Sequence, residues 1–334
     1  MKSLNGIAIA GNVLTDNVKM VKIYPEKGML ATIESESLAV GGCVPNVGIS
    51  LKKIAPDLKV KAYGRVGQDH KGEFVVESME QVGIDVSGVK KDKGAPTSYS
   101  DVMTVKSTGE RTFFHNRGAN AYFCPEDVEI DKLDVKILHI GYLMLLDAFD
   151  KVDENGKTVM QEFLSKVREK GIKTSIDLVS ESNGNFKAVA TGSLAQCDYV
   201  IINEIEAGEI VGDNPRDKDG NLDEQSVENI MRKLFAFGIK EKLIVHCPEK
   251  AFCLSKCGKL TVKNSIKLPK NFIKGSVGAG DAFCAGSLYS IYHGYSDEEI
   301  LSFSNLVAIN CLSQTDSTSG VCEKERLLDV LKNI

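Results

Sequence analysis

The sequence has no tryptophan, few aromatic residues (7%) and no block of like charge among its 46 acidic and 41 basic residues. A net charge of −5 without a basic cluster argues against a surface that binds nucleic acid. Long hydrophobic runs are also missing, since no stretch approaches the roughly 20 apolar residues that cross a bilayer. The apolar run after Gly6 has only four residues, too few for a signal peptide. We therefore expect a soluble, cytoplasmic protein with neither a membrane nor a nucleic acid as its partner.

The nine cysteines form no Cys-x-x-Cys pair and lie scattered through apolar stretches. An odd number of cysteines placed in this way is typical of small buried side chains in a reducing compartment. The five histidines show no metal-ligand spacing, and the pair Cys253 and Cys257 has no companion ligands nearby in the sequence. The sequence therefore does not predict a structural zinc site.

Short apolar runs typical of buried strands alternate with segments of helical periodicity along most of the chain. The predicted strands cover residues 7–10, 59–63, 137–140, 172–178, 199–202 and 243–245, and the predicted helices cover 47–54, 72–82, 157–170 and the region around 227–234. This alternation predicts an α/β fold with a mainly parallel central sheet and helices on both of its faces.

Two segments, residues 13–40 and 96–120, interrupt this alternation with patterns that predict antiparallel ribbons. We expect them to pair into a small sheet that stands off the core, and we call the two segments together the lid. Phe113 and Phe114 are expected to pack within the second ribbon. Arg111 and Arg117 of the same ribbon fit either cross-strand pairing, which is the commoner situation, or contact with an anionic group of a substrate.

The strongest local signal is the glycine-rich run from residue 275 to 280, followed by Asp281 and a predicted helix that ends at Gly294. Glycines at a helix N-terminus expose backbone N–H groups to an anion, and the helix dipole favours negative charge there. Asp281 can cap the helix, or it can accept a proton from an attacking hydroxyl group. A capped helix start without catalytic function fits the four residues Gly278 to Asp281 equally well. A Walker A loop is excluded, because Asp281 and Ala282 occupy the positions of its Lys and Ser/Thr.

A second signal is the pair Gly41 and Gly42, followed by Asn46 at the start of a predicted helix. Paired glycines allow close backbone approach, and an Asn side chain offers a donor and an acceptor to a polyhydroxylated ligand. A glycine turn with Asn46 as the helix N-cap explains the same residues. Asp16, after the first strand, would alone be read as a solvated turn residue.

Taken in order along the chain, these segments resemble the PfkB (ribokinase-like) family of carbohydrate kinases over nearly the whole length. The resemblance rests on residues 11–16, Gly41-Gly42-x-x-x-Asn46, residues 64–72, residues 118–120, Asn203-x-x-Glu206 and residues 278–281. It implies a three-layer α/β core made of residues 1–12, 41–95 and 121–334, and a lid made of residues 13–40 and 96–120. In related proteins the lid often pairs between two subunits, so the resemblance also implies a homodimer.

The activity implied by the resemblance is ATP-dependent phosphorylation of a primary hydroxyl group of a small sugar. Asp281 would be the general base, and the backbone of Gly278, Ala279 and Gly280 would form the anion hole for the phosphoryl group. The sugar hydroxyls would be held by Asp16, Gly41, Gly42 and Asn46. On the nucleotide side, Asn203 and Glu206 would organise Mg²⁺ through water, with no direct protein ligand, and Asn305 would lie near the adenine.

Three differences from the family pattern qualify these expectations. Gly275-Ser276-Val277 replaces the usual Asp-Thr-Thr, whose Asp helps build a monovalent-cation site in ribokinases, which argues against activation by K⁺. The usual Thr-x-Gly-x-x-Gly nucleotide loop is replaced by residues 246–251, which match neither Thr nor Gly. Leu14 stands where ribokinase has a ribose-binding Asn, which favours a fructose-like sugar over ribose.

Two alternatives to a sugar kinase remain. The scaffold also serves kinases of nucleosides and of already phosphorylated sugars. The altered segment 246–251 fits, in addition, a sugar-binding regulatory protein that has lost catalysis.

Overall fold

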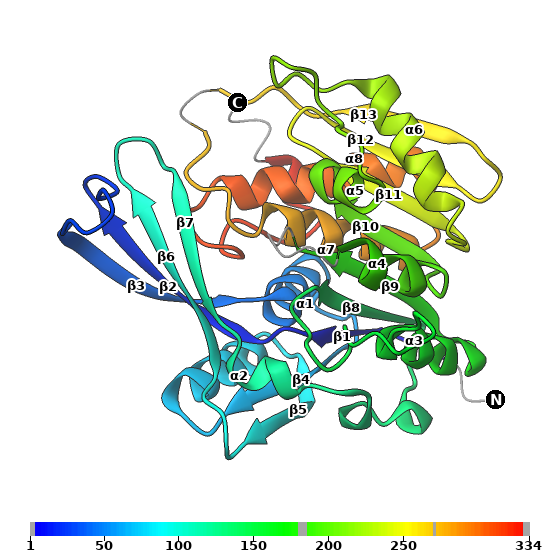
Figure 1. The fold of residues 1–334 in the computed structure, drawn as a ribbon, viewed down its shortest axis with the longest axis horizontal. Helices are drawn as coiled ribbons and strands as arrows, with labels where there is room; N and C mark the ends of the chain where they lie inside the picture. Colours follow the sequence, from blue (N-terminus) through cyan, green and yellow to red (C-terminus); the bar gives the residue numbers. More distant parts are fainter. Residues whose placement is uncertain (1–3, 180–185, 270–271, 330–334) are drawn as a thin grey trace.

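The computed structural model describes residues 4–179, 186–269 and 272–329, and it contains two β-sheets (Figure 1). The larger sheet has nine strands in the order β13-β12-β11-β10-β9-β8-β1-β4-β5. They are β1 (Ile7–Gly11), β4 (Val60–Gly67), β5 (Asp85–Asp92), β8 (Ile137–Leu143), β9 (Lys173–Leu178), β10 (Tyr199–Asn203), β11 (Lys242–His246), β12 (Lys250–Ser255) and β13 (Leu260–Asn264). All neighbouring strands pair in parallel except β12 and β13, which extend one edge in antiparallel fashion.

Helices cover both faces of this sheet, which confirms the predicted three-layer α/β fold. The helices are α1 (Cys43–Ile54), α2 (His70–Gln81), α3 (Val159–Glu169), α4 (Phe186–Leu194), α5 (Glu204–Val211), α6 (Glu224–Phe235), α7 (Ala279–Tyr292) and α8 (Asp297–Leu312). Strand β1 shows how the sheet serves two cores. Ala8 and Ala10 pack with residues of α3 to α6, whereas Ile7 and Ile9 pack with residues of α1, α2, α7 and α8. Alternate side chains of a strand point to opposite faces, so a fully apolar strand feeds both layers.

The lid segments form the second sheet, which has four strands in the order β3-β2-β6-β7. These strands are β2 (Leu14–Val21), β3 (Ile33–Gly41), β6 (Ser98–Val105) and β7 (Arg111–Asn116). Each ribbon is antiparallel, as expected, and the two ribbons join through a parallel pairing of β2 with β6. Figure 1 shows this sheet, in blue and cyan, projecting from the side of the larger sheet. Three short 3₁₀ turns, η1 (Gly118–Tyr122), η2 (Pro125–Asp127) and η3 (Ile130–Lys132), lead from β7 back to the core.

The start of α1 differs from the prediction. The helix begins at Cys43 rather than at residue 47, and Gly42 is its N-cap with a φ of 88°. Asn46 therefore lies inside the first turn and is not the N-cap. An early start was hidden by Pro45, which is compatible with the first turn of a helix because the missing N–H has no partner there in any case.

The cysteines are mostly buried: six of the nine are buried, Cys124 and Cys322 are half-buried, and Cys257 is exposed. This agrees with their interpretation as small apolar side chains. Phe113 and Phe114 contradict the expectation of packing within the ribbon, because 57% and 52% of their surfaces are exposed. Within the described ranges, no helix has the length and apolar character needed to cross a membrane.

Candidate active site

Two cavities meet at the N-terminal end of α7. The larger, of about 1020 Å³, lies between the lid and the core, and the smaller, of about 530 Å³, lies on the other side of the same helix start. Asn203 and Ser276 line both cavities. The larger cavity is lined by Leu14, Asp16, Gly42, Asn46, Ser100, Arg111, Phe113, His115, Arg117, Tyr142, Glu206, Val277, Gly278 and Asp281, among others.

The predicted anion hole is the partition between these cavities. Gly278 and Asp281 line the larger cavity, whereas Ala279 and Gly280 line the smaller one. Gly278 is the N-cap of α7 and has a φ of 75°, a conformation that L side chains rarely adopt. A Cβ atom at this position would lie 2.4 Å from Cβ of Ser317, so the close approach of these two segments requires glycine.

Asp281 lies at the base of the larger cavity, and hydrogen bonds fix both of its carboxylate oxygens. The hydroxyl group of Tyr142 donates to Oδ1 at 2.7 Å, and Nδ2 of Asn46 donates to Oδ2 at 2.9 Å. The hydroxyl group of Ser317 in turn donates to Oδ1 of Asn46 at 2.7 Å, which fixes the orientation of the amide. Asp281 therefore does not cap α7, although the sequence allowed that role. Its carboxylate is aimed at the cavity by three segments far apart in sequence.

Tyr142 is a site residue that the sequence analysis missed. It lies on β8, and Oδ1 of Asn12 accepts a hydrogen bond from its backbone N–H at 2.6 Å. Nδ2 of Asn12 also donates to the carbonyl of Leu145 at 3.1 Å, so this buried amide ties β8 to the end of β1. The available signal was a tyrosine near the carboxyl end of an apolar strand, where open parallel sheets bind their ligands.

Two carboxyl groups in the larger cavity have raised pKa values. Burial raises the pKa of Asp281 to about 6, against the opposing effect of its hydrogen bonds from Tyr142 and Asn46. Burial and then the nearby charge of Asp281 raise the pKa of Asp16 to about 7, while a hydrogen bond from Ser100 and the charge of Arg111 act in the other direction. A carboxylate whose pKa lies close to neutrality is suited to accept a proton during a reaction.

Strand register brings Asp16 into the cavity. Asp16 lies opposite Ala39 on β3 and opposite Ser100 on β6, and Ser100 lies opposite His115 on β7. These residues share one face of the lid sheet, and Oγ of Ser100 is 3.1 Å from Nδ1 of His115. A Cβ atom at Gly41 would lie 2.6 Å from Oδ2 of Asp16, so the absence of a side chain there leaves room for the carboxyl group.

Asn203 and Glu206 face the junction of the two cavities and bond to each other. The side chain of Asn203 accepts from the N–H of Glu206 at 2.8 Å, and Oε2 of Glu206 accepts from the N–H of Asn203 at 3.0 Å. This arrangement is a capping box at the start of α5. The Asn-x-x-Glu spacing is thus satisfied locally by a helix cap, while both side chains remain at the cavity wall.

A third acidic group, Asp177 on β9, lies close to this wall. Burial raises its pKa well above the usual range, and the charges of Glu206 and Asp281 raise it further. Among the described residues, no cation forms an ion pair with Asp177, and the N–H of Leu178 donates a hydrogen bond to its Oδ1 at 2.7 Å. Carboxylate oxygens without a counter-charge are the donors that Mg²⁺ prefers. The residues at this wall therefore fit a divalent cation, which the sequence assigned only to Asn203 and Glu206.

The smaller cavity is mainly apolar and holds Asn305 of α8. Its walls include His246, Cys247, Pro248, Ile266, Leu268, Ile273, Phe283, Ala308 and Leu312. Nδ2 of Asn305 is buried and has no hydrogen-bond partner in the part of the chain that is described. An apolar slot with one unused amide donor fits a flat heterocycle that carries ring nitrogens. The segment 246–251, which lacks the glycines of the family loop, contributes side chains to this slot.

His139, Asp177 and Cys284 form a buried group with ligand atoms within 4.8 Å of one another. The sequence gave no hint of it, because the three residues come from β8, β9 and α7. Sγ of Cys284 is 3.5 Å from Nε2 of His139, whose Nδ1 lies 2.9 Å from Oγ of Ser175. These contacts satisfy the imidazole without a metal ion, and burial lowers its pKa to about 3, which keeps it neutral.

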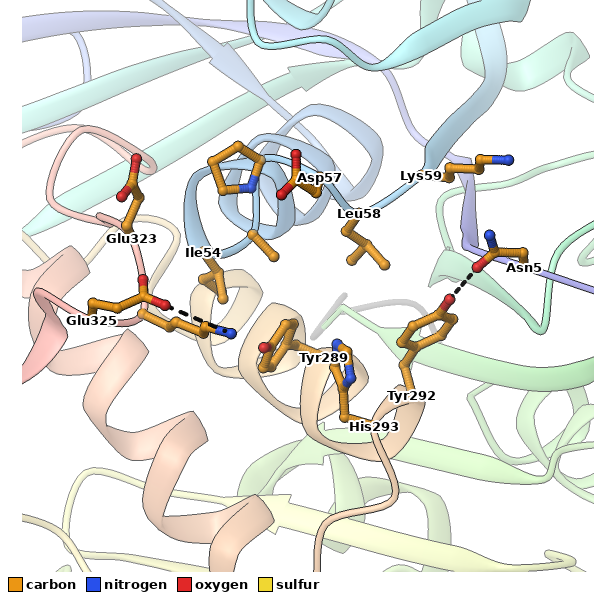
Figure 2. Close-up of a pocket in the computed structure, with 13 residues that line it drawn as sticks. Asn5, Ile54, Asp57, Leu58, Lys59, Tyr289, Tyr292, His293, Glu323 and Glu325 are labelled. Carbon is orange, nitrogen blue, oxygen red and sulfur yellow. Dashed lines mark hydrogen bonds and ion pairs between the residues drawn. The ribbon is translucent and has the colours of Figure 1, made fainter.

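Another cavity, of about 550 Å³, lies at the opposite end of α7 (Figure 2). Tyr289, Tyr292 and His293 of that helix face Leu58 and Asp57 there. None of the site residues predicted from the sequence lies in this cavity, and the candidate site is therefore the pair of cavities at the start of α7.

The sequence of this chain matches that of the pfkB family of carbohydrate kinases over residues 6–324. The ribokinase of Arabidopsis thaliana is 22% identical, over 98% of this chain and 81% of the relative. The adenosine kinase of Schizosaccharomyces pombe is 22% identical, over 86% of this chain and 84% of the relative. The probable chloroplastic fructokinase-6 of Arabidopsis thaliana is 26% identical, over 87% of this chain and 73% of the relative.

Comparison with solved structures gives the same fold. The Arabidopsis thaliana ribokinase complexed with ribose and ATP superimposes with a TM-score of 0.80, covering 98% of this chain and 99% of the other, at 19% sequence identity. The ribokinase-like fold predicted from the sequence is thereby confirmed.

Proposed function

Since the chain belongs to the pfkB family of carbohydrate kinases, and is thus a phosphotransferase acting on a sugar hydroxyl, we propose that it transfers the γ-phosphoryl group of ATP to a primary hydroxyl of a small monosaccharide. One observation carries this assignment. The carboxylate of Asp281, oriented through both oxygens, lies where a polar cavity meets the backbone N–H groups of a helix start. An apolar slot adjoins that helix start on its other side.

In the proposed reaction, the sugar occupies the larger cavity and the nucleotide base occupies the smaller one. Asp281 takes the proton from the acceptor hydroxyl, and the acceptor oxygen forms a bond to the γ-phosphorus. The bond from that phosphorus to the β,γ-bridging oxygen breaks, and its electron pair leaves with ADP. The N–H groups of Gly278, Ala279 and Gly280 stabilise the charge on the phosphoryl oxygens. Asp16, Gly42 and Asn46 line the wall that would hold the sugar hydroxyls, and Gly41 lies against the carboxyl group of Asp16.

Asn46 has a restricted role in this scheme. Its Oδ1 accepts from Ser317 and one N–H donates to Asp281. An Asn amide has two donors, so one N–H remains for the substrate. We infer that Asn46 orients the general base and offers a single donor to the sugar.

Asp177, Glu206 and Asn203 would hold Mg²⁺ at the wall between the two cavities, directly or through water. The bound ion would neutralise charge on the phosphates of the nucleotide. Asn305 would place its unused amide donor against the adenine.

The acceptor that we propose is a fructose-like sugar. Leu14 lines the cavity beside Asp16, and an apolar side chain there cannot hydrogen-bond a hydroxyl group. A nucleoside acceptor is the second candidate, since adenosine kinase is among the relatives and the cavity volume of about 1020 Å³ accommodates a larger molecule than a hexose.

The assay that tests the function is coupled ADP release with Mg-ATP, against ketoses, aldoses, sugar acids, nucleosides and hexose phosphates, with and without K⁺. We expect turnover on a neutral ketose that does not require K⁺. In Asp281→Asn, which keeps the size of the side chain, turnover should fall by about 10²- to 10⁴-fold. The matched control is Asp57→Asn, because Asp57 is exposed in the cavity at the far end of α7 and should be dispensable.

Two results would reject parts of the proposal. Normal turnover of the Asp281→Asn variant would remove Asp281 as the base. Calorimetry that detects sugar binding by the wild-type protein but no affinity for ATP or ADP would favour a regulatory protein without catalysis.

We also propose that two copies associate through the lid. The face of the lid sheet that points away from the cavity carries Leu38, Asn17, Asp101 and Phe114 in one row across the four strands. Leu38 and Phe114 are 44% and 52% exposed. Apolar side chains on an exposed sheet face favour association with a partner surface.

A further inference from the structure

Arg111 begins β7 and reaches across the larger cavity from the lid to the core. Its side chain shares the cavity face of the lid sheet with Phe113 and His115, which follow at intervals of two residues. One terminal nitrogen, Nη2, lies 3.1 Å from the position that a Cβ atom would occupy on Gly275. Gly275 begins the glycine-rich run that leads to Gly278. The side chain of Arg111 thus occupies space that the missing side chain of Gly275 leaves open.

The guanidinium group of Arg111 forms no hydrogen bond and no ion pair with the protein in the ranges that the structure describes, although it feels the charge of Asp16. Its Nε atom is buried without a hydrogen bond, and the group forms no ion pair there. Burial lowers the pKa of Arg111, and the charge of Asp16 acts against this effect. Arg117, two strand positions beyond His115, differs in this respect, because it bonds to Asp147 at 2.7 Å and to the carbonyl of Met144. A partly desolvated cation without a fixed anion indicates a ligand that supplies one.

The position of the guanidinium decides which anion fits. Ser276, Val277 and Gly278 line the same cavity as Arg111. Gly275 lies directly against the guanidinium group of Arg111. The segment 275–278 leads into the helix start whose N–H groups would face the phosphoryl group in the proposed reaction. The free guanidinium therefore lies on the phosphoryl side of the cavity, while the carboxyl group of Asp16 stands beside it on the acceptor side.

We propose that Arg111 carries a fixed positive charge from the lid to the phosphoryl group during its transfer. This inference rests on the proposed function. The guanidinium exchanges no proton and forms no covalent bond. It pairs with oxygens of the moving phosphoryl group, whose charge the N–H groups of the anion hole share. Because the cation sits on the lid, the charge is in place only while the lid covers the cavity, which couples the exclusion of water to catalysis.

The test compares Arg111→Ala with Lys106→Ala. Lys106 lies at the exposed end of the lid and pairs with Glu34, so its loss removes one positive charge from the lid without touching the cavity. We expect kcat of Arg111→Ala to fall by about 10²- to 10³-fold with little change in KM for the sugar. Lys106→Ala should retain the wild-type kcat. Arg111→Lys should recover part of the loss, because it restores the charge but not the planar fork.

A second readout separates charge from structure. Guanidinium ion at millimolar concentration should partly restore kcat of Arg111→Ala, because the deleted group leaves a space of its own shape. It should leave wild type and Lys106→Ala unchanged. A purely structural loss would not respond to guanidinium, so failure of this rescue together with a lowered melting temperature would overturn the proposal.

Two further outcomes have distinct meanings. If Arg111→Ala raises KM for acidic or phosphorylated acceptors only and keeps kcat with neutral sugars, Arg111 recognises the acceptor and the proposal is wrong. If the wild-type protein shows no turnover with any acceptor in the panel, the proposed function fails first. If wild type turns over an acceptor and Arg111→Ala does so equally fast, the inference about Arg111 is wrong while the proposed function stands.

Discussion

At the scale of single residues, the candidate site depends on how Asp281 is held. The carboxylate is buried, yet hydrogen bonds from Tyr142 and Asn46 favour its ionised form. Burial has the larger effect, and the pKa settles at about 6. The group is therefore ionised at neutral pH and still basic enough to take a proton from a hydroxyl group.

This balance predicts an acidic limb in the pH dependence of kcat/KM. Activity should fall as the pH drops through about 6, because the proton then occupies Asp281. Protonation of Asp281 should not destabilise the folded protein over the same pH range. The pKa of Asp281 is higher in the folded than in the unfolded chain, so protonation between about pH 6 and the usual aspartate pKa of 3.8 stabilises the fold. Rates and melting temperatures recorded over one pH series check both parts. A rate that stays flat well below pH 6 would contradict the assignment.

The variant Tyr142→Phe should shift the acidic limb of the kcat/KM profile in a direction that the structure predicts. The hydroxyl group of Tyr142 donates to Asp281 and lowers its pKa, so its removal should move the acidic limb to higher pH. The variant keeps the ring, and the loss of kcat at high pH should be smaller than in Asp281→Asn. Tyr122→Phe is the control, because this tyrosine is 59% exposed. An acidic limb at the same pH as in wild type, or at a lower pH, would show that the hydroxyl group of Tyr142 does not lower the pKa of Asp281.

Residues of the site differ in how far the sequence could reveal them. Asp281 and the glycines before it form a local sequence pattern, and this pattern alone predicts their chemistry. Tyr142 and Ser317 reach the site through contacts with residues more than a hundred positions away, and no short motif marks such contacts. The free guanidinium of Arg111 is a further case. The sequence favoured a cross-strand partner for it, whereas the structure leaves its Nε without one in the described ranges.

At the scale of elements, the start of α7 joins two parts of the core. Gly278 packs its backbone against Ser317, and Ser317 holds Asn46 of α1. The helix start, the segment after α8 and the first turn of α1 therefore position one another. We therefore expect a change in any of the three to displace the carboxylate of Asp281.

Gly278→Ala and Gly294→Ala test this packing as a matched pair. Both glycines have a φ of 75°, so both substitutions carry the same backbone strain, about 1 kcal/mol or somewhat more. Only at position 278 does the new Cβ meet other atoms, at 2.4 Å, whereas nothing lies within 4 Å of the Cβ at position 294. Gly278→Ala should therefore unfold at clearly lower denaturant concentration than Gly294→Ala and lose most of its turnover. Equal midpoints for the two variants would show that strain alone, without the contact, determines the cost.

At the scale of the whole molecule, periodicity predicted the layers but not all the pairings. The alternating apolar runs identified the parallel core and the two lid ribbons, because a strand buried on both faces is visible in the sequence itself. The parallel pairing of β2 with β6 joins segments separated by the whole of α1, β4, α2 and β5, and no local signal encodes it. The two antiparallel strands β12 and β13 at the edge of the core were likewise not predicted.

The proposed association through the lid predicts a concentration-dependent dimer. Phe114→Asp places a charge at one end of the row of residues on the outer face of the lid sheet, next to Asp101 on the neighbouring strand. The variant should be monomeric in light scattering at concentrations at which wild type is dimeric. Thr112→Asp lies on the same strand and face, but outside that row, and should weaken the dimer less. A wild-type protein that is monomeric at all concentrations would reject the lid as an interface.

The outer strand β3 limits the ways in which the lid can grow into an assembly. As an edge strand it exposes unpaired backbone groups, which in many proteins template the addition of a foreign strand and lead to aggregation. Its exposed stretch alternates Glu34 and Glu36 with Ser35 and Ser37, so a second copy of β3 laid alongside would face like charges. The like charges on β3 therefore oppose edge-to-edge fibril growth along this strand. Addition of a further strand to the lid sheet is thereby opposed along β3, which is one of its two edges.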